Sequence, residues 1–78
     1  MNSPIEIPAD LGHAIRRARR RRGLRQEDLA LSAGTGMRFI GDLERGKPTV
    51  QLAPTLRVLH ALGLTLTLED EEDDDGDA

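Results

Sequence analysis

The chain has 78 residues, enough for one small domain, and a core of that size often needs oligomerisation to bury enough apolar surface. Its formal net charge of −3 conceals two opposite parts: residues 1–68 hold all eleven basic residues and six acids, whereas residues 69–78 hold eight acids. The absence of cysteine excludes disulfides and thiolate metal sites, and a single Phe with no Trp or Tyr excludes the aromatic platforms that bind single-stranded nucleic acid.

Residues 1–7 are predicted to form a flexible arm, and a first helix is predicted to begin at Pro8, whose missing N–H is no loss in a first turn. Apolar residues then recur at helical spacing, and Gly23 is a natural stop; the apolar positions are Leu11, Ala14, Ile15 and Ala18. An arginine cluster follows them, formed by Arg16, Arg17, Arg19, Arg20, Arg21, Arg22 and Arg25. Such a run is usually a solvated helix face, but beside the motif that follows it favours nucleic-acid binding.

Two short helices joined by a tight turn are predicted next. The second spans residues 26–33 and ends at Gly34, and the third runs from about residue 36 to residue 45 and ends before Gly46. Thr35 is the expected N-cap of the third helix. The positions where a helix-turn-helix buries its small core hold Leu29, Ala30, Ile40 and Leu43. This pattern predicts a DNA-binding motif whose later helix enters the major groove.

A fourth helix is predicted over residues 52–62, with Pro54 in the first turn, where it is tolerated. Its apolar face is expected to contain Leu52, Leu56, Val58, Leu59 and Leu62. Beyond Gly63, strict alternation of apolar and polar residues predicts a short strand made of Leu64, Thr65, Leu66, Thr67 and Leu68.

A lone strand needs a partner for its backbone N–H and C=O groups. We expect residues 64–68 to pair antiparallel with the same strand of a second copy about a two-fold axis, which makes the protein a homodimer. Two alternatives remain: the segment packs as an extended tail on its own helices, or it pairs with residues 3–7.

The third helix supplies the candidate base contacts. Arg38 is expected to read a guanine, because a guanidinium can bond O6 and N7 together. Met37 is expected either to contact a thymine methyl or to pack against a neighbouring helix. Asp42 is expected to pair with Arg38 or Arg45 when DNA is absent, and Gly41 to share their outward face.

Phosphate contacts are expected from Arg25, Arg45 and Lys47, and from Gln26 at the N-terminus of the second helix. Phe39, beside the buried stripe of the third helix, is expected in the core or at its edge. The complete predicted DNA-binding set is Arg25, Gln26, Thr35, Gly36, Met37, Arg38, Asp42, Arg45 and Lys47.

Other classes of function find little support. His13 and His60 are too isolated for a metal site, and no nucleophile lies beside a placed base, so we expect no enzyme activity, metal or cofactor. No apolar run approaches the roughly 20 residues that span a membrane, so a cytoplasmic location is expected. Residues 69–78 are expected to be a disordered, solubilising acidic tail; the alternative is that they dock on a basic partner or compete with DNA for the arginines.

Residues 11–62 resemble the phage-repressor (Xre) class of helix-turn-helix proteins. The positions that carry the resemblance are Gln26, Leu29, Ala30, Gly34, Ile40, Leu43, Glu44, Arg45 and Gly46. More narrowly, residues 38–49 (RFIGDLERGKPT) and 59–64 (LHALGL) resemble HipB-like antitoxins. One departure is Arg25, which stands where the class commonly has a Thr or Ser that caps the second helix, so that this cap must come from elsewhere or be missing.

The resemblance implies an all-α fold of four to five helices over residues 8–63, followed by a dimer-forming β-strand over residues 64–68. It also implies an antitoxin that binds double-stranded operator DNA, represses its own operon and binds a HipA-type serine/threonine kinase toxin away from the recognition helices. Two other functions remain: a stand-alone repressor without a toxin, and a protein-interaction module that does not read DNA. The expected outward positions of Gly41 and Asp42 leave room for the second, since neither makes strong DNA contacts.

Overall fold

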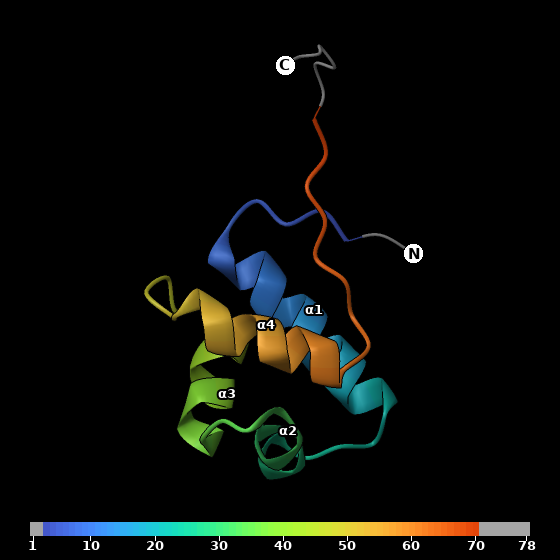
Figure 1. The fold of residues 1–78 in the computed structure, drawn as a ribbon, viewed down its shortest axis with the longest axis vertical. Helices are drawn as coiled ribbons and strands as arrows, with labels where there is room; N and C mark the ends of the chain where they lie inside the picture. The colour runs from blue at the N-terminus through green and yellow to red at the C-terminus, as the bar shows by residue number, and fades with distance from the viewer. Residues whose placement is uncertain (1–2, 71–78) are drawn as a thin grey trace.

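The computed structural model describes residues 3–70, so residues 1–2 of the expected arm and residues 71–78 of the expected acidic tail lie outside the described residues. Within that range the chain forms helices α1 (Pro8–Arg21), α2 (Gln26–Ala33), α3 (Met37–Glu44) and α4 (Leu52–Ala61). Helix α2 packs against α3 and α4, and α1 packs against α3. Figure 1 shows α2 and α3 at one end of the molecule, while the segment after α4 extends from the other. The predicted all-α fold is confirmed, and none of the described helices is long and apolar enough to cross a membrane.

Helices α1 and α2 each begin with an acidic side chain that caps the backbone before the helix. Asp10 Oδ2 accepts hydrogen bonds from the N–H groups of Glu6 (2.9 Å) and Ile7 (3.1 Å), and Asp28 Oδ2 accepts from the N–H of Arg25 (2.9 Å). These backbone hydrogen bonds hold the pKa of both carboxyl groups below the ordinary value. Asp28 thus satisfies the N–H of the residue before α2, whereas the cap that a Thr or Ser at position 25 would give to the first N–H groups of the helix is missing.

The predicted N-cap of α3 is wrong. The cap residue is Gly36, with an extended backbone (φ −84°, ψ 158°) and no side-chain cap, while the Thr35 hydroxyl donates to the Gly36 carbonyl at 3.4 Å. The N–H of Thr35 donates to the carbonyl of Ala30 at 2.9 Å, so Thr35 closes α2 and does not open α3. Helix α3 therefore begins and ends one residue inside the predicted limits, at Met37 and Glu44.

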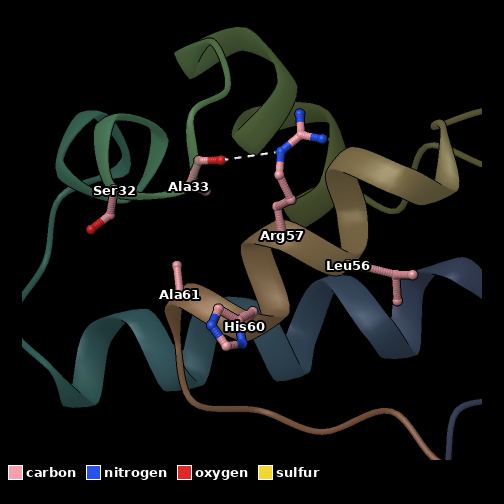
Figure 2. A pocket seen from close by; sticks show the side chains of 6 residues that line it. All are labelled: Ser32, Ala33, Leu56, Arg57, His60 and Ala61. Atoms are coloured by element: carbon pink, nitrogen blue, oxygen red, sulfur yellow. Dashed lines mark hydrogen bonds between the residues drawn. The ribbon is translucent and has the colours of Figure 1, made fainter.

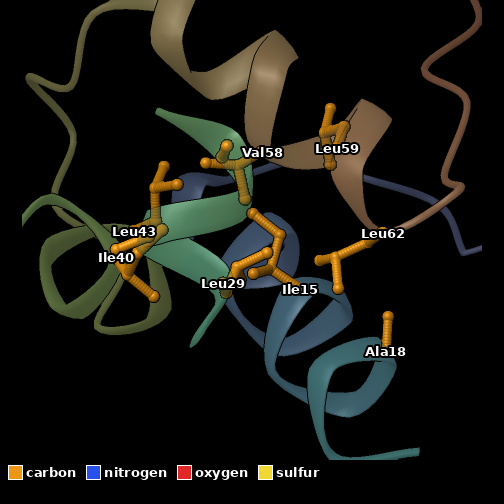
Figure 3. Close-up of a cluster of buried hydrophobic side chains, with 10 residues drawn as sticks. Ile15, Ala18, Leu29, Ile40, Leu43, Val58, Leu59 and Leu62 are labelled. Atoms are coloured by element: carbon orange, nitrogen blue, oxygen red, sulfur yellow. The ribbon is translucent and has the colours of Figure 1, made fainter. Parts of the chain in front are cut away.

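The hydrophobic core lies between the helices, as Figure 3 shows. Its largest fully buried side chains are Ile15, Leu29, Ile40, Val58 and Leu62, and the other buried apolar residues are Ala18, Ala30, Ala33, Leu43 and Leu59. All four core positions predicted for the helix-turn-helix are among them. Phe39 packs against this cluster as a partly buried side chain, which confirms its interpretation as a residue at the edge of the core.

The predicted buried face of α4 is wrong at its N-terminal end. Leu52 and Leu56 are 65% and 43% exposed, and Thr55 is buried in their place. Burial of the Thr55 hydroxyl is possible because it donates to the Gln51 carbonyl at 2.6 Å. The buried positions Thr55, Val58, Leu59 and Leu62 follow helical spacing, but on a face rotated from the one that the leucines suggested.

Two helical glycines are buried for different reasons. A Cβ at Gly12 would overlap the carbonyl oxygens of Leu43 and Glu44, the second at 2.8 Å, so α1 and the end of α3 are in direct backbone contact. Gly41 is buried although an outward position was predicted, because the side chain of Arg45 covers it: a Cβ there would lie 3.1 Å from Arg45 Nη1. Helical periodicity places a Cα but does not show which long side chain folds over it.

The predicted strand after α4 is absent from the part of the chain that the structure describes. Leu64 is held on the core, and its N–H donates to the carbonyl of Leu59 at 2.9 Å, whereas Leu66 and Leu68 are 46% and 97% exposed. Pairing with residues 3–7 is also absent from the described residues. A strand forms only beside a second backbone, and residues 3–70 of this single chain place none beside this segment.

Candidate nucleic-acid interface

Helices α2 and α3 are joined by a turn that requires glycine. Gly34 adopts a left-handed backbone conformation (φ 71°, ψ 36°), and its N–H donates to the carbonyl of Leu31 at 3.3 Å. The two helices are then held together by Leu29 and Ile40, which have no exposed surface. This geometry confirms the predicted helix-turn-helix and gives α3 the place of the recognition helix (Figure 1).

A buried ion pair fixes α1, α2 and α3 relative to one another. Glu44, at the end of α3, accepts hydrogen bonds from Arg19 Nε (2.6 Å) and Nη2 (3.0 Å), and from Gln26 Nε2 (3.2 Å). Arg19 Nη1 also donates to the Leu24 carbonyl, between α1 and α2, at 2.8 Å. The Arg19 and Glu44 side chains are only 11% and 4% exposed. This bidentate pair holds α1 against the end of α3, and the Gln26 hydrogen bond adds the start of α2.

The charge state of this ion pair follows from its surroundings. Burial raises the pKa of Glu44, but the hydrogen bonds from Arg19 and Gln26 outweigh that effect and leave the pKa below its ordinary value. The hydrogen bond to Glu44 raises the pKa of Arg19. Both groups are therefore charged at neutral pH, and the pair is a fixed structural element behind the recognition helix.

From the sequence, Glu44 was named only as part of the family pattern and was given no structural role, and Arg19 was not separated from the other arginines. The signal was present in the spacing: Glu44 lies four residues after Ile40, on the buried side of α3. Arg19 in turn lies four residues after the buried Ile15. An acid on a buried helix face needs a cation, and an arginine on the inner edge of a neighbouring helix is the obvious source.

The first turn of α3 exposes the two candidate base-contacting side chains. Met37 is 54% exposed, and Arg38 is also exposed. Within residues 3–70, Arg38 forms none of the ion pairs found in the protein. Its guanidinium is therefore available to a ligand without first breaking a salt bridge.

The far end of α3 carries a small surface ion-pair network centred on Asp42. Its carboxylate lies 2.7 Å from Arg45 Nη2 and 3.6 Å from Lys47 Nζ. The predicted pairing of Asp42 with Arg45 is confirmed, whereas pairing with Arg38 does not occur among the described residues. Asp42 thus holds two of the predicted phosphate contacts at one end of α3.

The N-terminus of α2 presents Arg25 and Gln26. Arg25 Nε lies 3.3 Å from Asp28 Oδ2, and this hydrogen bond raises the pKa of the guanidinium, whose side chain remains 74% exposed. Gln26 points its amide toward Glu44, so its second N–H is the one left for a phosphate. The predicted contact set lies on α2, α3 and the turns next to them: Arg25, Gln26, Thr35, Gly36, Met37, Arg38, Asp42, Arg45 and Lys47.

A second surface feature is a hollow of ≈ 320 Å³ between α2 and α4. Figure 2 shows its lining, formed by Ser32, Ala33, Leu56, Arg57, His60 and Ala61. Arg57 Nε donates to the Ala33 carbonyl at 3.4 Å, which ties the two helices together. None of these lining residues belongs to the predicted DNA-binding set, so the hollow is a separate surface feature.

Comparison with known proteins identifies the family. The model of a helix-turn-helix domain family matches residues 10–71. The chain belongs to this helix-turn-helix family. Over 68 residues, this helix-turn-helix chain is 47% identical to the uncharacterized HTH-type transcriptional regulator y4mF of Sinorhizobium fredii (strain NBRC 101917 / NGR234), covering 87% of this chain and 90% of the relative.

Solved structures narrow the resemblance of this helix-turn-helix regulator to HipB. A HipB–O4 20mer complex contains a chain of 27% identity that superposes with a TM-score of 0.81, covering 91% of this chain and 100% of the other. The chain matched in a HipA–HipB–O2–O3 complex gives the same identity, TM-score and coverage. Family model, curated relative and solved structures agree on a HipB-like regulator of the Xre type.

Proposed function

We propose that this helix-turn-helix regulator is a sequence-specific, dimeric transcriptional repressor and the antitoxin of a HipA-type kinase module. The observation that carries the proposal is the exposed first turn of α3, where Arg38 stands without an ion-pair partner among residues 3–70 on a helix fixed by the core and by Glu44. The HipB chains of similar fold in complexes described with O2, O3 and O4 support it.

The side chains divide into base-reading and positioning contacts. Arg38 reads a guanine through paired hydrogen bonds, and Met37 contacts a neighbouring thymine methyl. Arg25, Gln26 and the cations at the end of α3 bind phosphates and set the position of α3 without reading sequence. Asp42 holds its partners in place in the free protein and releases them when phosphates take over.

The dimer is the second part of the proposal. Residues 65–68 leave the core with exposed leucines, and a second copy supplies the backbone that a strand over residues 64–68 requires. Two helix-turn-helix units related by a two-fold axis then bind a palindromic operator, with half-sites about 34–36 Å apart or a multiple of that distance.

The toxin partnership is the third part, and the similar HipB chain in the HipA–HipB complex supports it. The alternative is a stand-alone repressor. A kinase-like reading frame beside this gene, whose product copurifies with the regulator, is the expected finding. A neighbouring gene of another kind, with no kinase retained on the tagged regulator, would leave the repressor without a toxin.

The DNA proposal is tested by fluorescence anisotropy at two salt concentrations, with the DNA upstream of the gene and a scrambled duplex of equal length. Nanomolar binding to the upstream DNA alone, weakened by salt, is the expected result, because neutralised phosphates release counterions. Equal and weak binding to both duplexes would contradict sequence-specific repression and favour a protein-interaction module.

A further inference from the structure

The solvent-facing side of α1 carries a positive surface. It is formed by the exposed side chains Arg16, Arg17, Arg20 and Arg21 of α1 and by Arg22, which follows the helix; we call this set the arginine face. Within residues 3–70 none of them takes part in an ion pair; the one polar contact is from Arg17 Nη2 to Ser3 Oγ at 3.3 Å. Like charges at i and i+4 repel, so this face favours a counter-charge.

The chain that leaves α4 begins beside this face. A Cβ at Gly63 would lie 2.9 Å from Arg22 Nη2, so the guanidinium rests against the backbone where α4 ends. Leu64 is then anchored on the core through its side chain and through its N–H to Leu59. Figure 1 shows the following segment running away from α2 and α3. The described chain therefore leaves the helical body beside the C-terminal end of α1, on the side away from the recognition helix.

The acidic segment, residues 69–77, matches the arginine face in length and is opposite to it in charge. Residues 69–77 carry eight acids, against five arginines on the face. Nine residues extend to at most about 30 Å, whereas α1, at ~1.5 Å per residue, is about 21 Å long. A connection of only residues 65–68 gives the acidic segment a high effective concentration at the arginine face.

We propose that residues 69–77 of the same chain bind the arginine face of α1 and shield it from DNA phosphates. Binding to unrelated DNA depends on charge alone, whereas operator binding also uses the contacts of α3, so the acidic segment lowers non-specific affinity more than operator affinity. The proposal rests on the DNA-binding role proposed above, and it adds an intramolecular competitor that improves the ratio of specific to non-specific binding.

The test neutralises the acidic segment at constant length, with every Asp of residues 70–77 replaced by Asn and every Glu of residues 69–72 by Gln. Affinity for a scrambled duplex should rise about tenfold at low salt, because several exposed ion pairs of small individual strength are lost together. The gain should shrink as salt rises, and the gain for operator DNA should be smaller.

Repeating the neutralisation in a variant that lacks part of the arginine face tests whether the gain in DNA affinity depends on α1. In the variant Arg16→Gln, Arg17→Gln, Arg20→Gln, neutralising the acidic segment should change the scrambled-duplex affinity less than twofold. Glutamine is a good helix former, and circular dichroism checks that α1 is retained. An unchanged affinity on neutralisation, or the same gain in both backgrounds, would overturn the proposal.

A readout without DNA separates this proposal from the proposed function. The Nε–Hε NMR signals of the arginine face should shift when the acidic segment of the full chain is neutralised. The signal of the buried Arg19, also on α1, should stay in place. Unshifted signals would overturn the intramolecular contact even if operator binding were intact. Shifted signals in a protein that fails to prefer its upstream DNA would support the contact and reject the repressor.

Discussion

Among single residues, Glu44 has the largest expected effect on stability. Glu44→Gln leaves the mostly buried Arg19 without a charged partner and should lower the free energy of unfolding by about 3 kcal/mol at pH 7. Asp42→Asn is the matched control, because its partner Arg45 is 70% exposed and such a pair contributes at most about 1 kcal/mol. Urea unfolding followed by circular dichroism measures both, and equal losses would contradict the structural role of the buried pair.

The same pair predicts how stability depends on pH. The pKa of Glu44 is lower in the folded chain than its ordinary 4.5, so the unfolded chain binds more protons between the two values. The pair's contribution is complete above that ordinary pKa and is lost as pH falls through the folded pKa. Unfolding curves between neutral and acid pH should show a shallower loss in Glu44→Gln than in the wild type; parallel curves would contradict the assignment. Some loss remains in the variant, because the pKa values of Asp10 and Asp28 are lowered as well.

Gly12 sets the contact between α1 and α3. Gly12→Ala gains about 1 kcal/mol in helix propensity, but its Cβ would overlap backbone oxygens that cannot move aside, which costs about 1–3 kcal/mol. We expect net destabilisation. Gly41→Ala is the control, since the three nearest atoms belong to the flexible Arg45 side chain, and it should be neutral or stabilising. A thermal melt that ranks the two variants in the opposite order would refute the close approach.

Arg38 and Lys47 should differ in kind as DNA contacts. Arg38→Ala should lose about 1–3 kcal/mol of preference at one base pair, whereas Lys47→Ala should weaken binding to all duplexes alike. Anisotropy with the operator and a set of single-base-pair variants distinguishes the two. If both substitutions gave the same profile, the division into base reading and phosphate binding would be rejected.

At the scale of elements, the sequence predicted most helix limits because their signals are local. Pro8 and Gly34 act through their own backbone, and no distant residue changes that action. Thr35 was misassigned as the N-cap of α3 because it belongs to the end of α2: its N–H bonds the Ala30 carbonyl, and α3 begins after Gly36. The face of α4 was misassigned because a buried threonine is satisfied by its own helix, through the Gln51 carbonyl, which hydrophobicity does not reveal.

The parts of the candidate site that depend on local spacing were predictable from the sequence, and the parts that depend on helix packing were not. The helix-turn-helix and the exposed position of Arg38 follow from spacing within α2 and α3. The pairing of Glu44 with Arg19 joins positions 25 residues apart, so it depends on how α1 packs against α3 and is not a local property. For the same reason Gly12, an unremarkable glycine in a helical pattern, became recognisable as a packing residue only beside the end of α3.

The strand over residues 64–68 is the element that a second copy would complete. Removing residues 65–78 should give monomers, because the strand is lost while Leu64 stays on the core. Removing residues 69–78 is the matched control and should leave the dimer intact. Sedimentation velocity measures both, and a stable dimer in the shorter protein would exclude the strand as the dimer interface.

At the scale of the whole molecule, the proposed two-fold symmetry predicts how the spacing of the half-sites affects binding. Two α3 helices on one rigid dimer reach two half-sites only when both face the same side of the duplex. Inserting about 5 bp between the half-sites turns one of them to the far side, and affinity should fall to that of a single half-site. Inserting about 10 bp returns both half-sites to the same side of the duplex but separates them by a further helical turn. Affinity would then recover only if the dimer could span that extra turn.

The measurement is anisotropy on the operator, on both insertions and on a duplex with one half-site destroyed. For a dimer held by short strands we expect both insertions to bind like the single half-site, because the strands leave little freedom between the two helix-turn-helix units. Equal affinity for all four duplexes would mean that each unit binds alone, and the symmetric operator would be wrong. Recovery at 10 bp alone would keep the symmetry but require a connection looser than a strand pair anchored at Leu64.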